Sequence, residues 1–118
     1  MVATSERMLH VVYSVGSLER TGLFLKALGM DLLRARDVPS EKYTNEVCGF
    51  GTESLGAHFS LELTYNYGVE SYEVGSGLGA FILACDDPVA VAGRMASAGF
   101  EQKPVLGGKF NSSRILSG

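Results

Sequence analysis

The chain has 118 residues, of which 46% are hydrophobic, and a formal net charge of −3 at pH 7. This length allows one domain with a substantial hydrophobic core, and the composition excludes a disordered chain. The negative charge gives no electrostatic basis for binding nucleic acid, and no apolar run approaches the roughly 20 residues of a membrane span.

Two features of the sequence bear on the compartment. The first residues, MVATSER, lack the hydrophobic core of a secretory signal. Cys48 and Cys85 each lie in an apolar, strand-like run, which favours buried reduced thiols over a disulfide or a reactive thiol. We therefore expect a soluble protein of a reducing compartment, either the cytoplasm or an organelle matrix or stroma.

The first predicted unit covers about residues 8–68. It begins with a strand at 8–15, whose side chains alternate between two faces, so that His10 shares a face with Val12 and Ser14. The opposite face, which we expect to lie in the core, carries Val11, Tyr13 and Val15.

A helix is predicted over about residues 18–28, between an N-cap at Ser17 and a left-handed C-terminal residue at Gly29. Three strands are expected after it, at about residues 30–34, 43–50 and 57–66. In the last of these, apolar and polar residues alternate, which places Glu62 on the polar face. The unit therefore has the order β-α-β-β-β.

A linker at residues 69–78 leads to a second unit at 79–118. The glycines at its end favour a flexible connection over a phosphate loop, because their spacing is G-x-G-x-G and no helix follows at once. The elements expected in the second unit are a strand at 79–85, a helix from Pro88 to Gly99 capped by Asp87, and strand pieces near 100–105 and 109–116.

The segment at residues 10–30 recurs without gaps at 80–100, displaced by 80 − 10 = 70 residues. Ser17 aligns with Asp87 and Gly29 with Gly99, whereas His10 aligns with Ala80. Such a repeat predicts a paired fold. We expect one α+β domain over residues 1–118, with an incomplete second module, since a full copy would end near 68 + 70 = 138.

Three segments, LGMDLLR (28–34), EKYTNEVCGFG (41–51) and LELTYNYGV (61–69), are similar to glyoxalase I, the lactoylglutathione lyase of the vicinal oxygen chelate superfamily. The similarity covers about residues 9–109. It implies paired βαβββ modules that curve into open barrels, usually in a dimer, around a Ni²⁺ or Zn²⁺ site. The implied reaction isomerises the hemithioacetal of methylglyoxal and glutathione to lactoylglutathione.

In that reaction an octahedral metal polarises two substrate oxygens, and a metal-bound carboxylate moves a proton between adjacent carbons. Four protein ligands are implied, two from each module. The resemblance assigns the first-module pair to His10 and Glu62, with Glu62 as the catalytic carboxylate if the site is completed. It also assigns Asn66 to glutathione binding.

The second-module positions depart from the family pattern. The third ligand falls on Ala80, and its neighbours on the same strand face, Ile82 and Ala84, have no donor atom. The fourth would be residue 62 + 70 = 132, which lies beyond residue 118. Two charged contacts to glutathione fall on Ser14 and Leu106.

A symmetric homodimer would give each site only the pair His10 and Glu62. Two protein ligands rarely hold a catalytic metal tightly, so we expect no cofactor in the isolated chain, and Ni²⁺ or Zn²⁺ only where the site is completed. His58 could replace a ligand, but a solvent-facing edge histidine is the simpler interpretation. Three tyrosines could line a pocket or simply pack on the sheet: Tyr65, Tyr67 and Tyr72.

The sequence leaves three functions open. The favoured one is a glyoxalase I-like protein with a degenerate metal site, acting as a non-catalytic binding or structural subunit. Its partners would be other protein chains that dock on the open sheet edge or at the module interface. The alternatives are a lactoylglutathione lyase, which binds the glutathione adduct in a site completed by a partner or a further C-terminal segment, and a metal-free small-ligand binding protein.

Overall fold

The computed structural model describes residues 9–53, 58–73, 75–76, 81, 83–105 and 110–114; of residues 104–105 and 110–114 only the backbone is described. The elements run in the order β1 (His10–Ser14), α1 (Leu18–Leu28), β2 (Asp31–Val38), β3 (Tyr43–Gly49), β4 (Ser60–Asn66), α2 (Pro88–Ser97), β5 (Glu101–Val105) and β6 (Phe110–Arg114). Within this part of the chain, no helix is both long enough and apolar enough to cross a membrane.

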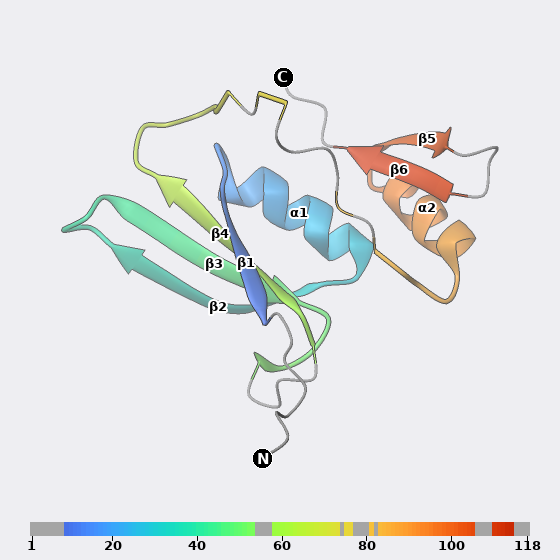
Figure 1. Ribbon diagram of the computed structural model, residues 1–118, viewed down its shortest axis with the longest axis horizontal. Helices are drawn as coiled ribbons and strands as arrows, with labels where there is room; N and C mark the ends of the chain where they lie inside the picture. The colour runs from blue at the N-terminus through green and yellow to red at the C-terminus, as the bar shows by residue number, and fades with distance from the viewer. Residues whose placement is uncertain are drawn as a thin grey trace, which may run out of the picture.

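The first five elements form a four-stranded sheet in the order β1-β4-β3-β2, with α1 across one face (Figure 1). β1 runs parallel to β4, and the β4–β3 and β3–β2 pairs are antiparallel. β5 and β6 form a separate antiparallel pair that lies beside α2 (Figure 1). The predicted β-α-β-β-β order of the first unit, and the α+β class, are confirmed.

The core lies between α1 and the sheet. Leu25 of α1 and Leu63 of β4 are among its buried residues, together with Met30, Cys48 and Leu61. The face of β1 that was expected to be in the core packs against them through Val11, Tyr13 and Val15. His10 therefore lies on the other side of the sheet, away from α1.

The two helices repeat the same local chemistry 70 residues apart. The Ser17 hydroxyl accepts the Arg20 amide at 3.1 Å, and the Asp87 carboxylate accepts the Ala90 amide at 3.0 Å. Gly29 and Gly99, just beyond each helix, have φ angles of 110° and 92°, where a Cβ would add strain. The sequence repeat at 10–30 and 80–100 is thus also a structural one in its helices.

Three expectations were wrong. The strand predicted at 79–85 is absent from its described residues, 81 and 83–85, and Phe81 instead packs edge-on against Tyr13 with ring centroids 4.7 Å apart. An apolar run becomes a strand only where a neighbouring strand satisfies its backbone, and no described strand pairs with it. Cys85 is accordingly exposed, whereas Cys48 is buried as expected. β2 also extends to Val38, because β3 pairs along its whole length.

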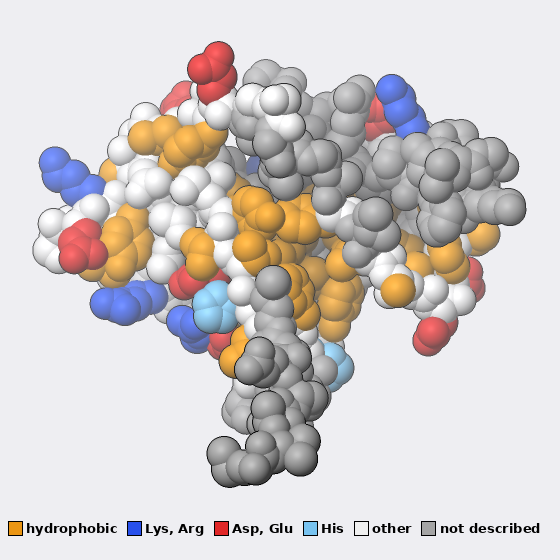
Figure 2. Space-filling model, in the orientation of Figure 1, with side chains coloured by type: hydrophobic (Ala, Val, Ile, Leu, Met, Phe, Trp, Pro, Cys, Tyr) orange, Lys and Arg blue, Asp and Glu red, His pale blue; other side chains and the backbone are white. Residues whose placement is uncertain are grey.

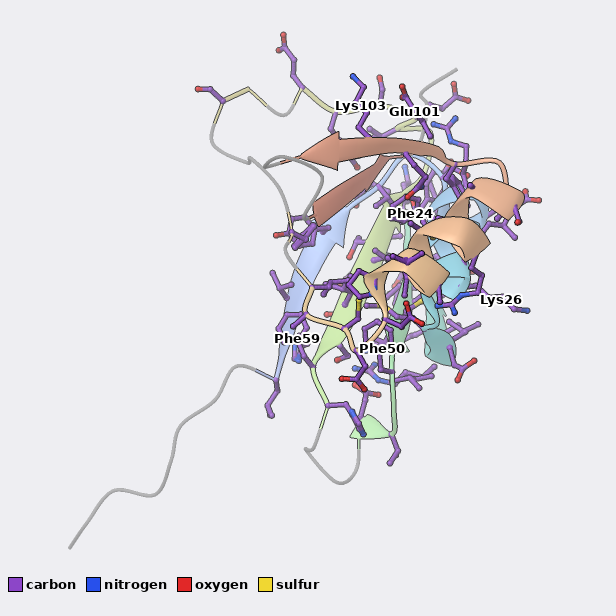
Figure 3. All side chains as sticks on the ribbon, turned by 90° about the vertical axis from the view of Figure 1, so that its right-hand side faces the viewer. Phe24, Lys26, Phe50, Phe59, Glu101 and Lys103 are labelled. Carbon is purple, nitrogen blue, oxygen red and sulfur yellow. The ribbon has the colours of Figure 1, made fainter. Side chains whose placement is uncertain are left out.

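Arg94 of α2 connects the second unit to the first. Its side chain donates hydrogen bonds to the carbonyl oxygens of Ala27, at 2.8 Å, and Leu28, at 3.0 Å. These carbonyls belong to the last turn of α1, where no amide of the helix is available to them and a cation is favoured. Beside this contact, Phe24 of α1 packs edge-on against Phe100, and Figure 3 shows Phe24 on the side of α1 near α2.

Replacing Arg94 by alanine is expected to lower the free energy of unfolding by about 1–2 kcal/mol, because two charge-assisted hydrogen bonds are lost at an exposed site. Arg94→Lys is expected to recover only part of this loss, since an ammonium lacks the planar fork that spans both carbonyls. Urea unfolding of the three proteins measures the difference. An unchanged midpoint for Arg94→Ala would contradict this assignment.

Candidate metal and substrate site

The register between β1 and β4 brings His10 and Glu62 to one face of the sheet. His10 lies beside Ser60 and Val12 lies beside Glu62, so that the two residues are diagonal neighbours on adjacent parallel strands. Strand geometry puts their Cα atoms roughly 8 Å apart, within reach of one ion for two long side chains. Both are on the face opposite α1; His10 is exposed and Glu62 is half-buried.

Glu62 is held by a short chain of hydrogen bonds. The Asn45 amide donates from Nδ2 to Glu62 Oε1 at 3.1 Å, and the Thr64 hydroxyl donates to Asn45 Oδ1 at 2.8 Å. Because the Glu62 carboxylate accepts, whereas the Thr64 hydroxyl could either donate or accept, it is Glu62 that requires the amide nitrogen of Asn45 to face it. One carboxylate oxygen is thereby oriented, while Oε2 accepts no hydrogen bond from any described residue. This is the kind of support that orients a carboxylate metal ligand.

A small hollow of about 80 Å³ lies beside His10 and is lined by Leu9, His10, Glu53, His58 and Ser60. His58 is one of only two histidines in the chain, and both are visible on the face shown in Figure 2. Its ring lies so close to Gly51 that a Cβ there would be 2.1 Å away, so a larger residue at position 51 would displace the ring. His58 and His10 therefore line the same hollow, and His58 is exposed, as the expected solvent-facing edge histidine would be.

Glu53 in the same hollow is already paired. Arg34 donates from Nε to Glu53 Oε2 at 2.8 Å and from Nη2 to Oε1 at 3.4 Å, in a forked ion pair. This pair raises the pKa of Arg34, chiefly through the hydrogen bond to Glu53. Arg34 reaches this face because the register of β2 shifts between Leu32 and Arg34.

Asn66 ends β4 on the same face as Glu62, roughly 13 Å farther along the strand. Its Nδ2 donates to the Tyr72 hydroxyl at 2.9 Å. Tyr65 accepts the Gly68 amide at 3.2 Å through its hydroxyl. Two of the three tyrosines therefore brace the chain around Asn66 by their hydroxyl groups.

The third, Tyr67, donates its hydroxyl proton to Asp37 Oδ1, which also accepts the Thr44 hydroxyl at 2.8 Å. These two donors lower the pKa of Asp37, with Tyr67 the larger cause. The Tyr67 amide also donates to the carbonyl of Lys42 at 2.9 Å, so that the β2–β3 turn is tied to the chain that follows Asn66.

Stability is therefore expected to depend on Asp37 at low pH. A carboxyl whose pKa is lowered by folding stabilises the protein above its unfolded-state pKa of about 3.9, and this contribution disappears as the pH falls through the folded value. We expect Asp37→Asn to melt at a lower temperature than the parent at pH 7, with the gap narrowing below about pH 4. Thermal unfolding of both proteins at pH 7 and pH 3 tests this prediction. A difference in melting temperature that is larger at pH 3 than at pH 7 would refute it.

The donor set fits half of a metal site. An imidazole and a carboxylate on one exposed face suit Ni²⁺ or Zn²⁺. Within residues 9–53, 58–73 and the shorter described stretches, no group of three or more His, Cys, Asp and Glu side chains could hold a metal ion. Ala80, Ile82 and Leu106 lie outside the described residues, and Ser14 and Ala84 are exposed. Further ligands would have to come from elsewhere.

Comparison with known proteins identifies the family of the chain. Residues 7–116 match the family model described as "Glyoxalase/Bleomycin resistance protein/Dioxygenase superfamily". A chloroplastic "Probable lactoylglutathione lyase" of Arabidopsis thaliana is 49% identical over 108 residues, which are 87% of this chain and 30% of the relative. The lactoylglutathione lyase of Salmonella typhimurium is 38% identical over 107 residues, covering 86% of this chain and 78% of the bacterial protein.

The crystal structure of glyoxalase I from Zea mays superimposes with a TM-score of 0.77 and 48% sequence identity, over 92% of this chain and 40% of the maize chain. The chain thus spans less than half the length of these plant relatives. With the family model matching nearly all of its residues, the chain belongs to the Glyoxalase/Bleomycin resistance protein/Dioxygenase superfamily and is glyoxalase I-like.

Proposed function

We propose that this chain supplies half of the active site of a lactoylglutathione lyase, and that another chain or further sequence of a longer protein supplies the other half. The observation that carries the proposal is the placement of His10 and Glu62 on one face of adjacent parallel strands, with Glu62 oriented by Asn45. The names of the relatives support the same activity. This reverses the preference for a non-catalytic subunit that the sequence alone suggested.

His10 and Glu62 would hold Ni²⁺ or Zn²⁺, which when bound polarises the two oxygens of the substrate. The Glu62 carboxylate accepts a proton from one substrate carbon and returns it to the next. Asn45 keeps one oxygen of that carboxylate fixed and leaves Oε2 available for the transfer. Val12, beside Glu62 and half-exposed, gives this part of the site an apolar wall.

Asn66 would bind the glutathione part of the hemithioacetal through its side-chain amide. Tyr72 already holds one end of that amide, which reduces the freedom that substrate binding would otherwise remove. The separation from Glu62 along β4 suits a substrate whose peptide part extends away from the reacting carbons. We place the protein in the cytoplasm or an organelle stroma, and one relative is named chloroplastic.

The test compares the isolated chain with the native assembly that contains it, isolated through a tag on this chain. Intact mass identifies a completing partner or a longer chain, and metal analysis of the same sample reports an occupied site. We expect isomerase turnover of the methylglyoxal–glutathione hemithioacetal with Ni²⁺ or Zn²⁺ in the assembly and at most weak turnover in the isolated chain. An assembly that contains no bound metal and shows no turnover would refute the proposal.

A non-catalytic subunit is the second candidate, because one observation still favours it. Ala80 aligns with His10 in the repeat, and alanine offers no donor atom for a metal. In that case the chain would bind its partner but leave the partner's turnover unchanged when removed. Measuring turnover of the assembly before and after removal of this chain separates the two functions.

A further inference from the structure

A groove of about 290 Å³ lies on the other side of the sheet, between α1, β2 and β3. Its walls include Leu18 and Leu23 of α1 and Leu32 of β2, and its floor includes Glu46 and Cys48 of β3. Since Glu46 and Cys48 share the face that carries the core, the groove is separated from Glu62 by the thickness of the sheet. It belongs to no part of the proposed active site.

The groove is open because α1 has no side chain at its centre. Nothing lies within 4 Å of a Cβ built on Gly22, although glycine inside a helix costs up to about 1 kcal/mol relative to alanine. Leu23 and Leu32 line the opening and are 57% and 58% exposed. The result is an apolar slot with two uncovered leucines at its rim.

A carboxylate without a partner lies at the floor of this slot. Glu46 is half-buried, and its neighbours across the sheet are Ala35 on one side and Leu63 on the other. Among the described residues, none donates a hydrogen bond to Glu46 or forms an ion pair with it. Glu46 therefore presents to the groove a negative charge that no described residue neutralises and that a bound cation would neutralise.

The charges around the groove favour the same kind of ligand. Glu19 and Asp31 line it together with Glu46, whereas Lys26 is the one cation among the described residues that line it. Lys26 is exposed and is seen on α1 in Figure 3.

We propose that this groove binds a small apolar cation, such as a primary alkylammonium ion. The ammonium group would pair with the Glu46 carboxylate, and the alkyl chain would lie over Gly22 and Cys48 between the two exposed leucines. This site is independent of the proposed lyase activity, because it uses none of the residues on the metal-binding face of the sheet.

The test is an NMR titration of the whole chain with n-hexylammonium, followed through the backbone amides of Gly22, Leu32, Glu46 and Cys48. We expect saturable shifts at these amides with a dissociation constant on the order of 1 mM. n-Hexanol and hexanoate have the same alkyl chain without the positive charge. We expect hexanol to bind at least about tenfold more weakly and hexanoate not to saturate.

Two variants distinguish the contribution of the Glu46 charge to binding from the contribution of the apolar groove. Glu46→Gln keeps the shape of the side chain and is expected to weaken hexylammonium binding by about tenfold, to the level of hexanol. Gly22→Leu fills the opening and should abolish saturation for both hexylammonium and hexanol. Gly22→Ala, which favours the helix, adds a smaller side chain and weakens binding less, and it serves as the test if leucine perturbs the fold. Glu41→Gln, outside the groove, is the matched control and should bind as the parent does.

Equal affinity for hexylammonium and hexanol, or an unchanged affinity in Glu46→Gln, would overturn the proposal. Shifts that do not saturate, or that centre on the face of His10, would overturn it as well. Because none of these measurements involves a metal or the hemithioacetal, failure here leaves the proposed lyase activity untouched.

Discussion

Replacing Glu62 by glutamine is expected to lower the isomerase turnover of the completed assembly by about 100-fold or more, the usual contribution of a positioned proton-transfer group. Glutamine has the same shape and still accepts the Asn45 hydrogen bond through its amide oxygen, so the sheet should fold unchanged. It loses the negative charge that binds a metal and the basicity that removes a proton. The measurements are kcat at saturating hemithioacetal and bound metal per chain.

Glu41→Gln is the matched control, because this exposed glutamate lies in the β2–β3 turn, away from Glu62. Its turnover and metal content should equal those of the parent. His10→Ala should reduce bound metal as strongly as Glu62→Gln does. If both variants at His10 and Glu62 keep full turnover, the active site is elsewhere and this chain acts as a non-catalytic subunit.

The helices and the face assignments could be predicted from sequence because they depend on local rules. Ser17 and Asp87 cap the two helices at positions that the repeat itself indicates. Side-chain alternation along β1 and β4 was sufficient to put His10 and Glu62 on one polar face, and the parallel register then makes them neighbours. Their role as ligands rests on the family resemblance and stays a prediction.

The surroundings of this pair could not be predicted, since they depend on how non-adjacent strands pair. In the sequence Asn45 stands out only as part of a family motif, and its contact with Glu62 requires the register that sets Val47 opposite Glu62. The alternation in β4 offered a signal, because any polar side chain on the same face of a neighbouring strand is a candidate partner. For Arg34 the sequence contains no such signal, because the register shift in β2 decides which face of the sheet its side chain reaches.

The failed strand at 79–85 has the same cause. Its apolar run satisfies the local pattern of a strand, but a strand also needs a partner for its backbone, and no described strand pairs with this segment. Phe81 instead uses its ring to cover Tyr13. The strand propensity of this segment was therefore outweighed by its tertiary surroundings. Strand formation depends on such surroundings in general, which makes strands hard to predict from sequence.

Replacing Leu63 by alanine is expected to destabilise the fold by about 3 kcal/mol, the largest effect on stability that we predict for a single residue. Leu63 is 2% exposed in the centre of the sheet under α1, so its removal leaves a cavity that rigid neighbours cannot fill. Leu32→Ala is the matched control: this leucine is 58% exposed, and its truncation should change the free energy of unfolding by less than about 0.5 kcal/mol. Urea unfolding of the two variants and the parent, with equal slopes, gives both values. A loss below about 1 kcal/mol for Leu63→Ala would mean that α1 does not pack on this sheet in solution.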